Sequence, residues 1–269
     1  SEHESIWPSY KRAVYEGADM VIGPFEKRQV SELAESEELI VPTLALNQVK
    51  NQDQHSTKNL YQFALTPEDE ISMITQKAKQ NGFIKAALII PDSSWGKRLA
   101  SDYAKKWQEL GGMIVSIQTY PDQTYDYSES IKQLLRLQES NQRRDLVRQT
   151  IGHDVDFTPR KRQDIDVIFM VAFAQQAKQI PLQITYNHGA DIPVYSTSQI
   201  ISKAFSEKDN MDLNGITYTD MPWLIDSTIP AISRLNKQQN TTYQRLFSFG
   251  VDSYQIMPYL KLMSQNNTE

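Results

Sequence analysis

Ser94 and Lys97 have the S-x-x-K spacing found in serine acyl-enzymes, where the serine attacks the substrate. Such enzymes also need a K-T-G-like element, and this sequence contains none. A serine that caps a helix, followed by a charged helical face, explains both residues without chemistry. The sequence therefore predicts no catalytic residue.

Histidine and cysteine, the usual ligands of a transition metal, are few in this chain. The four histidines, at positions 3, 55, 153 and 188, are scattered, and no H-E-x-x-H pair occurs. There is no cysteine, which excludes disulfides and thiolate metal sites. Neither a G-x-G-x-x-G motif nor a Walker loop is present to hold the phosphates of a nucleotide. We therefore expect no metal and no cofactor.

Acidic residues slightly outnumber basic residues over the 269 positions. The 28 lysines and arginines stand against 33 aspartates and glutamates, which gives a net charge of −5. A nucleic-acid-binding surface is normally basic, so we expect no nucleic-acid partner. No stretch approaches the roughly 20 apolar residues of a membrane-spanning helix. The polar start Ser1–Glu4 is not followed by the apolar segment of a signal peptide.

One long segment, residues 138–162, is locally basic. From Arg136 to Arg162 there are seven basic and four acidic residues, a local excess of three. The segment is either a solvated helix and loop or a docking surface, because long insertions in compact folds are often functional. In the second interpretation, planar guanidinium groups bind a carboxylate-rich patch of a partner. The candidates are Arg143, Arg144, Arg148, Arg160 and Arg162. Because Arg160–Arg162 directly precede an expected central strand, these residues could instead anchor the segment to the edge of a sheet.

The elements that must position these residues are arranged around the stretch 83–120. Residues 84–90 are a short apolar run stopped by turn residues, which is typical of a buried strand. Ser93 or Ser94 then caps an amphipathic helix, and two consecutive glycines end it. Residues 113–117 form the next strand. Two strands joined through a helix must be parallel, with a right-handed crossover.

Further apolar runs predict the other strands and divide the chain into two lobes. The first set is 20–22 and 39–46; the second is 84–90, 113–117, 165–172, 192–198 and 215–219. The alternation of strands and helices predicts an α/β fold with two doubly wound parallel-sheet lobes. Lobe 1 is expected to contain residues 1–66 and 227–269, and lobe 2 residues 67–226 with the charged insertion 138–162. With only two strands, lobe 1 should be incomplete at its N-terminus.

Three later helices complete the prediction. Residues 128–147 form one helix with apolar positions at Ile131, Leu134, Leu135, Leu146 and Val147. Residues 173–186 form a second helix, which is weakened by Pro181. Residues 241–263 form a long last helix, kinked at Pro258, whose buried face uses Phe247, Val251, Tyr254 and Leu262.

In a two-lobed open sheet, ligands lie at the carboxyl ends of the strands, in the crevice. The candidate ligand-binding residues at these ends are Pro24, Phe25, Asn47, Ser93, Ser94, Trp95, Phe173, Ser196, Thr197, Ser198 and Asp220. Ser93 and Ser94 also occupy a helix start that could hold an anion, although a serine there is by default a simple cap. No arginine falls at an expected strand end, so a carboxylate ligand would lack its usual bidentate partner.

Four short motifs, taken in order along the chain, resemble those of type I periplasmic binding proteins. They are Gly17–Pro24, Ile40–Ala45, Pro91–Gly96 and Phe249–Tyr254. A narrower set is similar to the C-terminal domain of the LppC/LpoA lipoprotein family: Arg160–Phe169, Pro193–Ser198, Asp212–Ile216 and Asp220–Leu224. Members of that family are outer-membrane lipoproteins of Gram-negative bacteria that activate a class A penicillin-binding protein, a peptidoglycan synthase. The resemblance implies a periplasmic domain held at the membrane only by a lipid on a cysteine that this sequence does not contain.

Three functions follow as hypotheses. The first is a non-enzymatic periplasmic regulator that binds the active state of a class A penicillin-binding protein. The second is a solute-binding domain for a small ligand, such as an amino acid or a cell-wall fragment, with hinges near Thr66, Ser198–Lys208 and Trp223–Ile229. The third is an enzyme of unknown reaction. A solute binder should show a ligand-dependent rise in melting temperature, whereas a regulator should stimulate its synthase.

Overall fold

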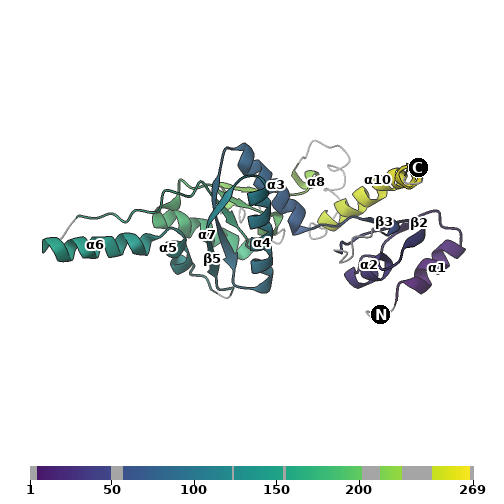
Figure 1. Ribbon diagram of the computed structural model, residues 1–269, viewed down its shortest axis with the longest axis horizontal. Helices are drawn as coiled ribbons and strands as arrows, with labels where there is room; N and C mark the ends of the chain where they lie inside the picture. Colours follow the sequence, from purple (N-terminus) through teal and green to yellow (C-terminus); the bar gives the residue numbers. More distant parts are fainter. Residues whose placement is uncertain are drawn as a thin grey trace. The chain divides into compact units, whose positions relative to one another are not determined.

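The computed structural model describes residues 5–49, 57–122, 124–153, 156–201, 213–225 and 244–266. The chain divides into two compact units, each of which is described here by itself (Figure 1). Unit 1 comprises residues 1–66 and 226–269, and unit 2 comprises residues 67–225. Each unit contains its own parallel sheet, as the α/β fold prediction requires.

The sheet of unit 2 has five strands in the order β5-β4-β6-β7-β8, and all neighbouring strands are parallel. Its strands are β4 (Lys85–Pro91), β5 (Met113–Tyr120), β6 (Val167–Met170), β7 (Val194–Ser196) and β8 (Ile216–Tyr218). In the register of the sheet, Leu88 of β4 lies between Ile117 of β5 and Phe169 of β6. All four residues of β6 are buried, as expected for a strand covered on both faces.

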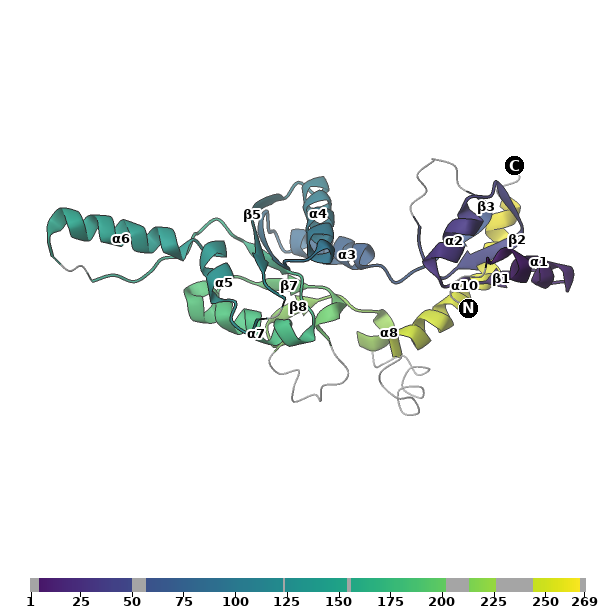
Figure 2. The same cartoon turned by 90° about the horizontal axis from the view of Figure 1, so that it is seen from below.

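Unit 2 also contains helices, most of which cover the two faces of this sheet. They are α3 (Pro67–Gln80), α4 (Ser94–Glu109), α5 (Ser128–Leu134), α6 (Leu137–Ile151), α7 (Ala174–Ile184) and α8 (Pro222–Ile225), with short helical turns η1 (Thr185–Gly189) and η2 (Ser198–Ile200). Figure 2 shows α3 and α4 on one side of the sheet and α5 and α7 on the other. The unit is therefore doubly wound, as the sequence predicts.

The two faces of the sheet bury separate apolar clusters. On one face, Tyr103 and Trp107 of α4 pack against Phe169, with ring centroids 5.0 and 5.2 Å from it. On the other face, Ile131 of α5 and Ile180 of α7 belong to a cluster built on β4 and β6. Because side chains of successive strand residues point to opposite faces, each short strand contributes to both clusters.

The helix α4 shows how the local sequence produces this packing. The Ser93 hydroxyl accepts a hydrogen bond from the Gly96 amide at 3.1 Å, so Ser93 is the N-cap. Near the other end of the helix, the Trp107 indole N–H donates to the Ile84 carbonyl at 3.0 Å. Gly112 follows the helix, where a Cβ atom would lie 2.3 Å from the Trp107 ring. A glycine is therefore required for the close approach of this turn to the indole.

Unit 1 is built on a three-stranded parallel sheet in the order β1-β2-β3. Its elements are α1 (Trp7–Tyr15), β1 (Val21–Ile22), α2 (Lys27–Ala34), β2 (Glu38–Ala45), β3 (Lys58–Gln62) and α10 (Gln244–Asn266). Tyr10, Leu33 and Leu39 form its small buried cluster. Phe249 of α10 stacks on Phe63, with ring centroids 4.9 Å apart.

Three sequence predictions need correction. Unit 1 contains β3 in addition to the two predicted strands, and β3 pairs with β2 although its sequence KNLYQ is not an apolar run. The helix predicted over 128–147 is two helices, α5 and α6, separated at Arg136, whose φ of +54° is left-handed. Beyond this break, Leu146 and Val147 are exposed.

The long C-terminal helix is present as α10, but its predicted buried face is wrong. Tyr254 and Leu262 are exposed, whereas Phe249 and Leu260 are buried. Pro258 lies inside the helix, and Pro181 likewise lies inside α7 without ending it. Residues 241–243, at the predicted start of α10, lie outside the described residues, as do the parts 202–208 and 226–229 of the expected hinges.

Candidate functional site

An aromatic pair lies at the carboxyl ends of two neighbouring strands of unit 2. Trp95, in the first turn of α4, follows β4, and Phe173 follows β6. Their rings are stacked, with centroids 4.8 Å apart and planes inclined by 13°. The Phe173 side chain is exposed. The sheet therefore places two of the predicted ligand-binding residues in direct contact, as parallel strands that end at the same edge should.

Ser94 and Lys97 lie in the same first turn of α4. The Lys97 ammonium forms an ion pair with a carboxylate oxygen of Asp92 at 2.8 Å, and Ser94 is exposed. Ser93 is the capping residue, and its hydroxyl is engaged by the Gly96 amide. These contacts match the interpretation of a capped, charged helix start.

The run Ser196–Ser198, at the end of β7, is buried and hydrogen-bonded within the unit. The Ser196 hydroxyl donates to the Met170 carbonyl at 2.7 Å. The Ser198 amide and hydroxyl both donate to the Glu70 carboxylate of α3, at 2.7 and 2.8 Å. A carboxylate of the protein itself thus occupies the pair of donors that an anionic ligand would need.

The same carboxylate affects a buried tyrosine. Burial raises the pKa of Tyr103 well above its ordinary value, and the negative charge of Glu70 raises it further. Within the described part of the chain, the Tyr103 hydroxyl has no hydrogen-bond partner. Tyr103 therefore remains a neutral phenol over the whole physiological pH range. Glu70 was not among the predicted site residues; it lies in the first turn of α3, where an acidic residue interacts favourably with the helix dipole whether or not it has a partner.

The candidate residues of unit 1 are likewise bonded to their own surroundings. The Asn47 amide donates to the Phe25 carbonyl at 2.9 Å, and its side-chain oxygen accepts from the Gln48 amide at 2.9 Å. Pro24 is buried behind a cis Gly23-Pro24 bond, and Phe25 is exposed. The structure thus brings Phe25 and Asn47 together.

Asp220 follows β8 in unit 2, and its side chain accepts a hydrogen bond from the Met221 amide at 2.8 Å. Of the candidate residues at the strand ends, most polar side chains are therefore bonded to the protein's own groups. Two of these strand ends expose an aromatic side chain to solvent: Phe25 in unit 1 and Phe173 in unit 2.

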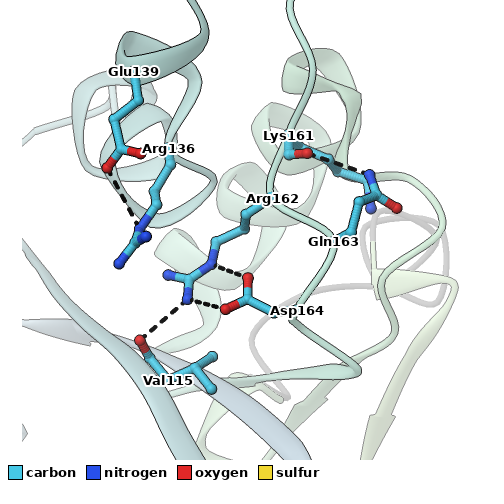
Figure 3. Close-up of polar contacts among 7 residues, drawn as sticks. All are labelled: Val115, Arg136, Glu139, Lys161, Arg162, Gln163 and Asp164. Carbon is cyan, nitrogen blue, oxygen red and sulfur yellow. Dashed lines mark hydrogen bonds and ion pairs between the residues drawn. The ribbon is translucent and has the colours of Figure 1, made fainter.

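The basic segment is held to unit 2 by the residues that precede β6 (Figure 3). The Arg162 guanidinium donates to both carboxylate oxygens of Asp164, at 2.6 and 2.7 Å, and to the Val115 carbonyl of β5 at 3.3 Å. Its side chain is only 6% exposed. Hydrogen bonds from Arg162 lower the pKa of Asp164 to about 2. Arg162 thus anchors the segment to the edge strand β5, as the alternative interpretation of the sequence predicts.

The neighbouring residues add to this anchor. Lys161 forms an ion pair with Asp191 at 2.9 Å, and the Arg160 amide donates to the Ser140 hydroxyl at 3.0 Å. The Arg160 side chain is exposed.

The three arginines of α6 differ in their contacts. Arg143 is exposed. The Arg144 guanidinium lies 5.4 Å from the centre of the Phe157 ring and pairs with Asp145 at 2.8 Å. Arg148 is exposed and also interacts with another group of the protein. Arg143, Arg144, Arg148 and Arg160 therefore remain candidates for a docking surface, and Arg162 has a structural role.

Among the residues that the structure describes, no three histidine or acidic residues come together as metal ligands. No described helix is long and apolar enough to cross a membrane. His153 follows α6, and His188 has a left-handed φ of +65°. His3 and His55 lie outside the described residues.

A doubly wound five-stranded parallel sheet in unit 2 and a smaller parallel sheet in unit 1, with the candidate residues at the carboxyl ends of the strands, give the chain a periplasmic-binding-protein-like α/β fold. The model of a protein family described as “LppC putative lipoprotein” matches residues 2–268. This chain belongs to that family.

Individual relatives agree with this assignment. A protein of Photobacterium profundum named penicillin-binding protein activator LpoA is 26% identical over 98% of this chain and 44% of its own length. This chain thus spans less than half of that relative. The solved C-domain of Haemophilus influenzae LpoA, described as a regulator of PBP1A, has a TM-score of 0.68 at 18% identity, over 96% of this chain and 73% of that one. A Chromobacterium violaceum structure described as a “putative branched-chain amino acid ABC transporter” also has a TM-score of 0.68, at 24% identity over 94% and 72%.

Proposed function

We propose that this chain is a regulatory domain that binds a class A penicillin-binding protein and increases its activity, and so supports peptidoglycan synthesis and cell shape. The membership of the LppC family and the names of its curated relatives support this proposal. The domain itself performs no chemistry on the substrate. Its partner is the synthase, and its effect is on the synthase's conformation.

The proposed location is the periplasmic face of the outer membrane of a Gram-negative bacterium. The description of the family as lipoproteins supports this location. In this proposal the lipid is attached to a cysteine outside the present sequence, and this domain touches the membrane only through that anchor. No cofactor is required.

The observation that favours a regulator over a solute-binding protein is the internal bonding of the strand-end polar groups. Glu70 accepts the hydrogen bonds of Ser198, and Asn47 bonds to the backbone around it. An anionic solute at Ser198 would have to displace the Glu70 carboxylate and leave it without these two partly buried hydrogen bonds, at a cost of about 1–3 kcal/mol. A protein partner needs only the rigid surface that these bonds maintain.

The proposed mechanism is a shift of the synthase toward its active state. A regulator changes such an equilibrium only by binding one state more tightly than the other. A tenfold preference corresponds to about 1.4 kcal/mol, which a small interface can supply.

The test is glycan polymerisation and peptide crosslinking by the purified cognate synthase, measured with and without the intact lipoprotein that contains this chain. We expect a saturable, severalfold stimulation of the class A enzyme. A monofunctional glycosyltransferase from the same cell serves as the control and should not respond. Unchanged synthase activity at saturating lipoprotein would reject the proposal. A melting-temperature rise of several degrees with an amino acid or a muropeptide, together with no stimulation, would support a solute-binding function instead.

A further inference from the structure

The helix α6 leaves the body of unit 2 immediately after α5, a helix whose inner face is buried. In α5, the side chains of Ile131, Leu134 and the following Leu135 are completely buried. At Arg136 the backbone becomes left-handed, and α6 then extends away from the sheet, as both views show (Figures 1 and 2). With 15 residues, α6 is about 22 Å long. We call residues 137–151, with the returning segment 156–161, the arm.

The base of the arm is fixed to unit 2 by several contacts. Leu137 and Ser140 are buried, and the Ser140 hydroxyl accepts from the Arg160 amide at 3.0 Å. The Arg162 amide donates to the Leu135 carbonyl at 3.0 Å, and the Arg162 side chain is bound to Asp164 and β5. The direction of the arm is therefore set before any partner binds, which reduces the entropy lost on binding.

The residues of α6 separate onto distinct faces. Leu137, Ser140 and Arg144 follow one another at spacings of three and four, and this face is turned to the returning segment, where Arg144 covers Phe157. A second face carries Arg143, Leu146, Val147 and Thr150, at positions i, i+3, i+4 and i+7, and all four are exposed. Residues at these spacings lie beside one another on a helix. We call this second face the docking face.

The docking face exposes an unusual amount of aliphatic surface for a short helix. Leu146 is 63% exposed and Val147 is 44% exposed, and the adjacent Ile151 is 57% exposed. The anchor positions of a helix that binds in the groove of another protein have the same i, i+3, i+4, i+7 spacing. A solvated surface helix needs no such cluster.

We propose that the docking face of the arm inserts into an apolar groove of the synthase, with a carboxylate at the rim of the groove that binds Arg143. This inference rests on the proposed function. The charge of the segment supports an acidic partner, because residues 136–162 carry an excess of three basic residues in a chain of net charge −5. Arginine binds a carboxylate with two parallel hydrogen bonds, which fixes orientation as well as affinity.

Two other occupants are less well matched to this face. A helix that lies on a membrane needs a broad continuous apolar side, whereas α6 carries only three exposed aliphatic residues among polar ones such as Glu139 and Asp145. A symmetric contact between two copies would bring two basic arms together, and like charges oppose this.

The test compares substitutions on the docking face with charge-matched substitutions at two exposed positions of α6 outside that face, in the intact lipoprotein. Leu146→Glu and Val147→Glu each add one negative charge to the face, and Gln142→Glu and Gln149→Glu add the same charge elsewhere. Arg143→Gln removes one positive charge without reversing it. Binding to the purified periplasmic region of the synthase is measured by titration, and glycan synthesis is measured in parallel.

We expect the Leu146→Glu, Val147→Glu double variant to bind the synthase at least tenfold more weakly, and Arg143→Gln about threefold more weakly. The two glutamine variants should remain within twofold of the unmodified protein. Because all five positions are solvent-accessible on α6, the melting temperature should not change in any variant. The loss caused by Arg143→Gln should shrink as the salt concentration rises, since salt screens exposed charges.

The outcomes separate the two proposals. If the unmodified protein neither binds nor stimulates the synthase, the proposed function fails, and the inference about the arm fails with it. If the unmodified protein binds but the docking-face variants bind equally well, only the arm is excluded as the interface. Loss of binding to anionic phospholipid vesicles, or loss of self-association, with synthase binding unchanged would also overturn the inference and assign the face to a membrane or to a second copy.

Discussion

The central strands of the two units differ in how completely they are covered. In unit 2, β4 and β6 lie between two layers of helices, and Phe169 is completely buried in contact with Tyr103 and Trp107. In unit 1, the middle strand β2 buries Leu39, but the adjacent Ile40 is 70% exposed. Neighbouring residues of a strand face opposite sides of the sheet. Among the described residues, β2 is therefore covered on both sides only at its carboxyl end, where Thr43–Ala45 are buried, and it is open on the side of Ile40 nearer its start.

This difference indicates which unit provides the rigid body of the domain. Apolar area removed from water contributes roughly 25 cal/mol per Å², so a sheet buried on both faces gains much more than one buried on a single face. Unit 2, which carries the arm, should be the more stable scaffold. Unit 1, with the small cluster of Tyr10, Leu33 and Leu39, should open at lower denaturant concentration.

The largest expected loss of stability comes from substituting a buried position in the sheet of unit 2, compared with an exposed position in the sheet of unit 1. Phe169→Ala should destabilise unit 2 by about 3–5 kcal/mol, because it removes buried area and leaves a cavity beside two aromatic rings. Ile40→Thr, which keeps a β-branched shape, should change the stability of unit 1 by less than about 0.5 kcal/mol. Urea unfolding followed by tryptophan fluorescence measures both. Equal losses at the two positions would show that the sheets are buried alike.

Alanine substitutions at two glycines, one in each unit, test the difference in packing, because they should change stability in opposite directions. Gly96→Ala should cost unit 2 about 1–3 kcal/mol, because the new Cβ would lie 2.3 Å from the Pro91 carbonyl oxygen. Gly250→Ala lies within α10 of unit 1, where no atom is within 4 Å of the new Cβ, and should stabilise the helix by up to about 1 kcal/mol. Thermal unfolding of both variants gives the sign directly. Two shifts in the same direction would contradict the contrast in packing.

The smallest effect concerns the ion pair of Arg162 and Asp164. Because the folded-state pKa of Asp164 is lowered to about 2, the pair stabilises unit 2 above the ordinary aspartate pKa near 4. That contribution is lost as the pH falls from about 4 to about 2. The Asp164 side chain is about half exposed, so solvent screening should keep the loss below about 1 kcal/mol. Urea midpoints should therefore decline more steeply with acid in the unmodified protein than in Asp164→Asn. Parallel curves would exclude a stabilising role for the pair.

The fold was predictable from sequence where apolar runs and turn residues coincide. The strands β4 and β6 have uninterrupted apolar cores, β5 begins with three apolar residues, and the start of α4 has a serine cap, so the sequence locates them well. The strand β3 has neither signal: its sequence is KNLYQ, and it becomes a strand because β2 offers backbone groups to pair with. Tertiary pairing of this kind overrides local propensity.

The break between α5 and α6 and the buried face of α10 were both predicted wrongly, because tertiary structure and not the local sequence pattern determines them. At the break between α5 and α6, Arg136 adopts the left-handed conformation that glycine usually adopts. Because no glycine or proline is present there, the sequence gives no signal of the break. In α10, apolar residues occur on several sides, so periodicity alone does not choose the buried face. Packing chooses it, through the contact of Phe249 with Phe63.

The candidate site was predictable in position but not in chemistry. Parallel strands end at one edge, so the sequence could predict that Trp95 and Phe173 would meet. It could not show that Glu70 bonds to Ser198, because these residues are 128 positions apart in the chain. The sequence likewise could not show that Arg162, unlike the other candidate arginines, has a structural role, because this role depends on the position of Val115 in the folded sheet.

The contact between Arg162 and Val115 has a consequence for how the protein behaves at high local concentration. β5 is an outer strand of its sheet, and the register between β4 and β5 shifts between Ala86 and Ala87, opposite Val115. An outer strand with unpaired carbonyl groups can recruit a strand from another molecule and begin aggregation. Here the register is irregular and the guanidinium binds the Val115 carbonyl of that edge, so we expect the anchor of the arm also to hinder the addition of a strand from a neighbouring molecule.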